Sequence, residues 1–256
     1  MDNNDIFFND PSPTPIDAQP PKYTKPTDDF RPLPSSDSDV FYLAITTPHT
    51  DTYTIHGPVP TFSHLLSLIE DITSNSPSAI DKLESLAYTD ADVWGEQTAD
   101  TAFEKNGFRT FVVEGQRGTY TVLHILSASN SAVRNALPAP VYTVTRHGPL
   151  VYPVSGVRAG TKMGVARGFA ATSALVGSFV DGEDARRAAR GAMERLVVGE
   201  GEVSRIEEWG AGEGGGVLLA MGVEKRWEVR VQYEDEALRK AREGADAEGA
   251  GVGWRY

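Results

Sequence analysis

The segment from Gly156 to Gly168 has the residue types of an anion-binding loop. Closely spaced glycines let backbone amides approach an oxyanion, and three basic residues add positive charge: Arg158, Lys162 and Arg167. His147 precedes this loop and is a fourth candidate ligand. The Gly-Lys-Ser/Thr order of a nucleotide-binding loop is missing. These four residues form a candidate anion site, and the alternative is that the loop is only a basic connector between two strands.

Histidine is a common transition-metal ligand, and the chain has five of them. They are His49, His56, His64, His124 and His147. An expected strand separates His49 from His56 by about 20 Å, at roughly 3.3 Å per residue. Only His56 and His64 can approach one another, and two ligands without a carboxylate make a poor site. We therefore expect surface or capping histidines, and no metal or other cofactor. No catalytic residue is predicted.

A short motif near the N-terminus points to protein recognition. Pro20-Pro21-Lys22-Tyr23 fits the Pro-Pro-x-Tyr pattern and resembles the ligands of WW domains. In such ligands, the prolines lie across an aromatic groove in the polyproline II conformation, and the tyrosine fills a second pocket. The resemblance implies that Pro20, Pro21 and Tyr23 bind a WW-domain protein. A chance match is the alternative, because proline is abundant in this segment.

The distribution of charge limits the classes of partner. The net charge of −12 argues against a protein that binds nucleic acid over its whole surface. Residues 141–198 differ, because they hold 8 Lys and Arg against 4 Asp and Glu, a net charge of +4. This segment is expected either to bind an anion, nucleic acid included, or to face acidic parts of the same molecule.

Several features indicate an intracellular protein. The chain has no cysteine, which excludes disulfides and thiolate chemistry and suits a reducing compartment. The first ten residues lack a signal-peptide pattern, and no apolar run approaches the ~20 residues that span a bilayer. We expect a cytoplasmic or nuclear protein with no membrane segment.

The N-terminal segment, residues 1–39, is expected to be disordered. It holds 8 of the 16 prolines and few large apolar residues, so burial cannot offset the entropy of ordering. Residues 244–256 are expected to be a flexible C-terminal tail. The folded part between them divides into a first half, 40–138, and a second half, 139–243.

Strand and helix patterns alternate in the same order in both halves. The first half is expected to have hairpins at 40–56 and 108–126, with helices at 62–72, 78–87, 98–106 and 129–137. The second half is expected to have strands at 141–145, 171–180, 217–223 and 227–233, with helices at 183–198 and 234–241.

We predict an α+β fold with antiparallel sheets and packed helices, in which a ββαββα unit is duplicated. Aligning Gly57 with Gly177 brings the apolar faces of the two following helices into coincidence. A chance alignment of common elements is the alternative.

These features favour a non-enzymatic interaction or scaffold protein with a recruiting tail, which binds a protein partner or forms a homodimer. The alternative is an enzyme or small-molecule binder that holds an anionic ligand in a cleft between the halves. The charge makes nucleic acid a third, weaker candidate.

Overall fold

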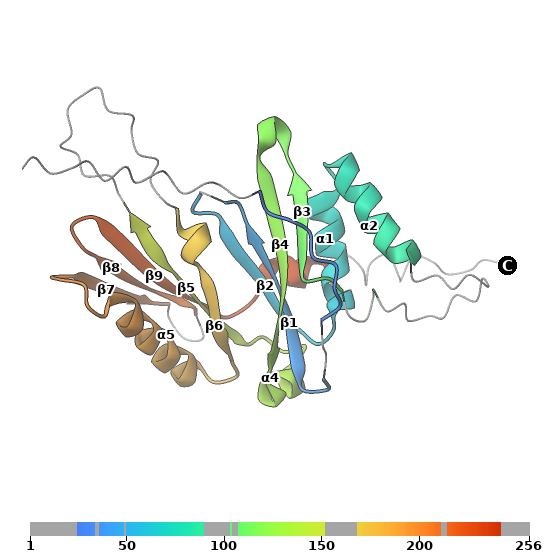
Figure 1. The fold of residues 1–256 in the computed structure, drawn as a ribbon. Helices are drawn as coiled ribbons and strands as arrows, with labels where there is room; N and C mark the ends of the chain where they lie inside the picture. The colour runs from blue at the N-terminus through green and yellow to red at the C-terminus, as the bar shows by residue number, and fades with distance from the viewer. Residues whose placement is uncertain are drawn as a thin grey trace, which may run out of the picture.

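The computed structural model describes residues 25–33, 36–48, 50–89, 103, 107–151, 168–210 and 214–241. The predicted α+β class is confirmed, since two antiparallel sheets lie between helices (Figure 1). No helix within these ranges is long and apolar enough to cross a membrane.

The first half forms a four-stranded sheet, called sheet A here. Its strand order is β2-β1-β4-β3, with every pair antiparallel. Both expected hairpins are present. The strands are β1 (Asp39–Thr46), β2 (Tyr53–Val59), β3 (Thr110–Glu114) and β4 (Tyr120–Ser129).

Helices cover one face of sheet A, which we call its outer face. The expected helix at 62–72 begins with a 3-10 turn, and large side chains from it, such as Phe62 and Ile69, pack on Phe111 and Leu123. The helical segments of this half are η1 (Phe62–Leu65), α1 (Leu66–Thr73), α2 (Pro77–Thr89), η2 (Gln116–Gly118) and α4 (Ser131–Ala136).

The second half forms a five-stranded sheet, called sheet B, with the order β6-β5-β9-β8-β7. Strand β7 is not among the predicted strands, because its charged, exposed residues give no hydrophobic alternation. Its segments are β5 (Tyr142–Val151), η3 (Phe169–Thr172), β6 (Ala174–Phe179), α5 (Gly182–Val197), β7 (Ser204–Trp209), β8 (Gly216–Met221) and β9 (Lys225–Gln232). Residues 236–241 form a last short helix.

Helix α5 covers the outer face of sheet B. Asp181 caps its N-terminus by accepting hydrogen bonds from two backbone amides, and Gly199 follows its end with a φ of 80°. Alanines at 185, 189 and 192 are fully buried against the sheet. Their small size lets the helix approach closely, so Trp227 supplies much of the bulk of this core.

The two sheets share an arrangement of strands. In chain order, β1, β2, β3 and β4 occupy the same relative places as β5, β6, β8 and β9, and β7 is an addition next to β8. A glycine with positive φ also accompanies the irregular pairing of the first two strands in each half, Gly57 and Gly177. Duplication of the unit stays a prediction, because a shared strand order does not establish common descent.

The faces opposite the helices, called the inner faces, pack on each other where β1 and β2 meet β5 and β6. Val40, Tyr42 and Ile55 of sheet A are buried there with Leu175 of β6. The Tyr42 hydroxyl donates to Ser178 Oγ over 2.9 Å, which joins the sheets. The resulting layer order is helices, sheet A, sheet B, helix (Figure 1).

Two helix caps also link the halves. Asn130 caps α4 and donates to Ser178 O over 3.0 Å. Asp235 caps the last helix and accepts from Gly57 N over 3.0 Å. It also hydrogen-bonds His56 Nδ1 at 3.2 Å. Each half therefore uses the cap of its last helix to hold the second strand of the other half.

Residues 25–33 belong to the segment expected to be a tail, and in the structure they lie along β3. Asp29 pairs with Thr110 in an isolated antiparallel bridge. The Asp28 carboxylate accepts from Val112 N over 2.7 Å, and the ring of Phe30 lies 5.9 Å from that of Phe111. This segment covers the β3 edge of sheet A.

Candidate functional site

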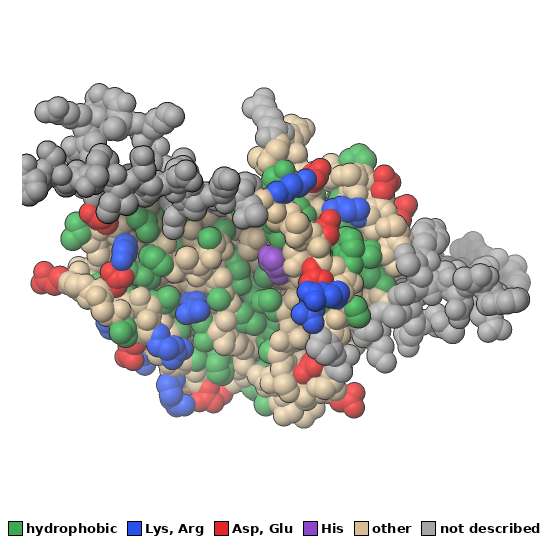
Figure 2. All heavy atoms as spheres, in the orientation of Figure 1, with side chains coloured by type: hydrophobic (Ala, Val, Ile, Leu, Met, Phe, Trp, Pro, Cys, Tyr) green, Lys and Arg blue, Asp and Glu red, His purple; other side chains and the backbone are tan. Residues whose placement is uncertain are grey.

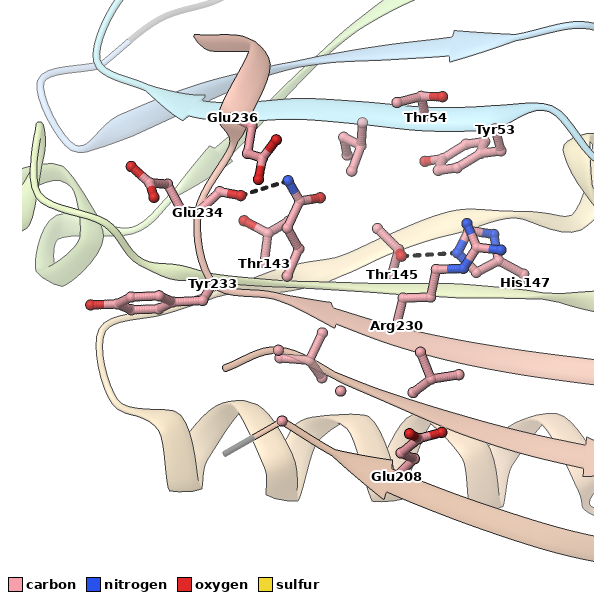
Figure 3. Close-up of a pocket in the computed structure, with 17 residues that line it drawn as sticks. Tyr53, Thr54, Thr143, Thr145, His147, Glu208, Arg230, Tyr233, Glu234 and Glu236 are labelled. Atoms are coloured by element: carbon pink, nitrogen blue, oxygen red, sulfur yellow. Dashed lines mark hydrogen bonds between the residues drawn. The ribbon is translucent and has the colours of Figure 1, made fainter. Parts of the chain in front are cut away.

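A cleft of about 720 Å³ lies between β2 of sheet A and the inner face of sheet B. Tyr53 and Thr54 of β2 form one wall, and Glu208 of β7 lies on the far side (Figure 3). Thr143 and Thr145 of β5 lie between them (Figure 3). The cleft therefore lies between the two halves.

Glycines leave bare backbone at the β7–β8 end of this cleft. Gly210, Gly215 and Gly216 line it. A Cβ atom on Gly215 would lie 2.2 Å from Val231 O, so this position excludes a side chain. Five glycines among residues 210–216 are the sequence signal for this bare backbone, which was not predicted.

His147 is buried in the cleft wall, with both ring nitrogens hydrogen-bonded. Nδ1 lies 2.9 Å from Ser173 Oγ, and Nε2 lies 2.9 Å from Thr145 Oγ1. Because Ser173 donates its one proton to Phe169 O, Nδ1 must carry the hydrogen and Nε2 must accept. The imidazole is therefore locked in one tautomer by two hydroxyl groups.

Burial keeps this histidine neutral. Desolvation, together with the positive charge of Arg230, lowers the pKa of His147 to about 4, although Glu228 acts in the opposite direction. Burial also raises the pKa of the neighbouring Tyr53 hydroxyl. His147 thus supplies no positive charge at neutral pH, and its role here is to hold β5 against the segment before β6.

Most of the charged side chains that line the cleft, among the described residues, are acidic. Arg230 lines it together with Glu208, Glu234 and Glu236. Arg230 forms a short hydrogen bond with Glu228, and Glu234 lies 3.5 Å from Arg239. Within the described ranges, the side chains of Glu208 and Glu236 form no hydrogen bond or ion pair. This lining favours a partner with positive charge.

The inner face of sheet B continues from the cleft as an exposed row of aliphatic side chains on β8. Leu218 and Ala220 point to α5, so Val217, Leu219 and Met221 lie on the inner face, and we call these three the β8 stripe. Met221 is 46% exposed and Val217 38%. Ile206 of β7, opposite Leu219, is 58% exposed. Hydrophobic side chains are visible among charged ones over sheet B (Figure 2).

The structure describes only one of the predicted site residues. His147 lies in the cleft wall, whereas Arg158, Lys162 and Arg167 are outside the described residues. Pro20, Pro21 and Tyr23 are also outside them. His56 and His64 bond Asp235 and Thr61 respectively, and the described ranges contain no cluster of three metal-ligating side chains.

Comparison of the chain with protein-family models, with curated proteins and with solved structures found no match.

Proposed function

We propose that this is a non-enzymatic interaction protein, which docks a protein partner on the inner face of sheet B. The observation that carries the proposal is the uncovered β8 stripe. On the inner face of sheet A, Val40 and Tyr42 are completely buried, whereas Met221 and Ile206 on sheet B are about half exposed. Neighbouring exposed aliphatic side chains with a charged rim are typical of protein–protein interfaces.

The hydrogen bonds of His147 favour binding over catalysis. A general base must be free to accept a proton from a substrate. Both nitrogens of His147 are engaged by Thr145 and Ser173, and its low pKa leaves Nε2 a weak base. The cleft offers hydroxyl, amide and carboxylate groups for recognition, with Glu208 and Glu236 available to a basic group of the partner.

Site-specific photo-cross-linking in cells tests the docking surface. A photoreactive amino acid in place of Met221 should give a cross-linked adduct of defined mass. The matched control is the same substitution at Val198, which is 78% exposed just after α5. Equal labelling from both positions, or none from position 221, would contradict docking on sheet B.

The tail adds a second recruiting element to this proposal. Pro20 and Pro21 favour the polyproline II conformation, so little ordering entropy opposes binding of a WW domain. Tyr23→Ala should weaken a peptide of residues 15–30 by about tenfold, on the order of 1.4 kcal/mol, because alanine cannot fill the tyrosine pocket. Lys22→Ala is the control and should bind normally. A wild-type peptide that a panel of WW domains ignores would remove this element.

The volume of the cleft supports a second candidate, a binder of small anionic ligands. About 720 Å³ lies within the range of small-molecule sites, about 300–1,000 Å³. Arg158, Lys162 and Arg167 would then supply the charge that the described lining lacks. Their joint replacement by alanine should abolish binding of a nucleoside triphosphate probe and leave stability unchanged. Unchanged binding would eliminate this site. Either function suits a cytoplasmic or nuclear location, given the absence of cysteine.

A further inference from the structure

We infer that the partner that docks on sheet B is a second copy of this chain, related by a two-fold axis that runs along β8. This inference rests on the proposed docking function and identifies the molecule that docks on sheet B. It is carried by the pattern of side chains across β7, β8 and β9, which is complementary to itself.

The strand register defines three rows of inner-face residues. Each row takes one residue from β7, one from the β8 stripe and one from β9. From the cleft outward, the rows are Glu208, Val217 and Arg230; Ile206, Leu219 and Glu228; and Ser204, Met221 and Arg226. The central column is aliphatic, and the first row ends in opposite charges.

An axis along β8 places each β8 residue against the same residue of the other copy. The β8 stripe then packs on itself, and β7 of one copy lies over β9 of the other. Glu208 of each copy faces Arg230 of the other, so two ion pairs form. An axis across the strands would instead place Arg230 over Arg226, and this like-charge contact costs free energy. Charge complementarity therefore selects the axis along β8.

The cleft supplies the space that this arrangement needs. Strand β7 is the edge of sheet B, with no further strand beside it among the described residues. Over β9, the cleft between β2 and β7 is open, and Arg230 lines it. The edge strand of the other copy enters this space, which leaves Glu208 next to Arg230 and covers the β8 stripe. Packing of one inner face on another already occurs within the chain, between β1–β2 and β5–β6.

The molar mass in solution is the first test. Light scattering at increasing concentration should show a dimer of twice 27.7 kDa. Met221→Lys and Val217→Lys should each raise the dimer dissociation constant about tenfold or more, because they bury like charges on the axis. Val198→Lys is the control and should dimerise normally. Thermal unfolding shows whether each variant is folded.

Single cysteines test the axis itself, since the natural chain has no cysteine. Facing sheets lie about 10 Å apart, which a short bis-maleimide can bridge. With the axis along β8, chains carrying Val217→Cys should cross-link to one another, and so should chains carrying Met221→Cys. With an axis across the strands, only a mixture of the two variants would cross-link.

Three results would overturn the inference: a monomer at all concentrations, a dimer that both lysine variants leave intact, or cross-links only between mixed variants. The proposed docking function can fail or hold independently of the dimer. A photo-adduct of position 221 with a different protein would support docking and exclude a second copy as the occupant, whereas loss of every adduct would reject docking as well.

Discussion

Sheets A and B share a strand order and differ in what covers them. Helices cover the outer face of sheet A, sheet B packs on its inner face, and residues 25–33 lie along its β3 edge. Sheet B has α5 on its outer face, but β8 is exposed on its inner face and β7 is an edge strand. Within the described residues, a shared strand order therefore leaves different surfaces exposed in the two halves.

The cores of the halves explain part of this difference. Large side chains of η1 and α1, such as Phe62 and Ile69, fill the space over sheet A. Helix α5 buries alanines instead, and these small side chains add little bulk over sheet B. The extra strand β7 widens sheet B beyond the area that sheet A covers.

The contrast between the inner faces predicts the largest effect. Tyr42→Ala should lower the free energy of unfolding by about 3–5 kcal/mol, because it leaves a cavity and frees Ser178. Met221→Ala should cost about 0.5 kcal/mol in the monomer, because the side chain is already half in water. Chemical denaturation at low protein concentration measures both. Similar costs would show that the two inner faces are equally buried.

The buried imidazole in the cleft should make stability depend on pH. The pKa of His147 is lowered to about 4, so the unfolded chain takes up its proton first as the pH falls. The stabilisation is complete above about pH 6.5 and is lost as the pH falls through 4, on the order of 3 kcal/mol in total. His147→Gln should lack this component in unfolding measured from pH 7 to 4. An identical pH profile for the variant would contradict the assignment.

Two truncations test the coverage of the β3 edge. A chain that begins at Lys25 should be as stable as the full chain, because the removed residues are poor in core-forming types. A chain that begins at Ser36 should lose about 2 kcal/mol, because Asp28 and Phe30 no longer contact β3. Thermal unfolding of both chains decides between a bound segment and a free tail. Equal stability of the two would indicate a free tail.

The smallest expected effect is the difference in unfolding free energy between variants of the two helix caps that link the halves. Asn130→Ala should cost about 1 kcal/mol, as the loss of an N-cap usually does. Asp235→Ala should cost about 1 kcal/mol more, because it also leaves Gly57 N and His56 without their acceptor. Burial opposes the charge of Asp235, but the bonds from His56 and the backbone amides prevail and lower its pKa. Equal losses of unfolding free energy in the two variants would mean that the two caps contribute equally to the contact between the halves.

Sequence patterns predicted most elements of the fold. Alternating β-branched and aromatic residues located both hairpins of sheet A, and the alanine periodicity identified the buried face of α5. Strand β7 escaped prediction because an edge strand with charged residues lacks that alternation. The sequence named His147 as a candidate anion ligand, but it could not show that burial keeps this imidazole neutral, because burial depends on tertiary packing.

By itself, the sequence determined the class of fold and the cysteine-free chemistry, because these depend on residue type and local spacing. Tertiary structure alone decided which faces are covered. The Asn130 and Asp235 links and the uncovered β8 stripe join residues that are far apart in the chain. Local patterns determine which face of its strand each side chain lies on. The packing of whole sheets determines whether that face is buried in a core, lines a cleft or is exposed to water.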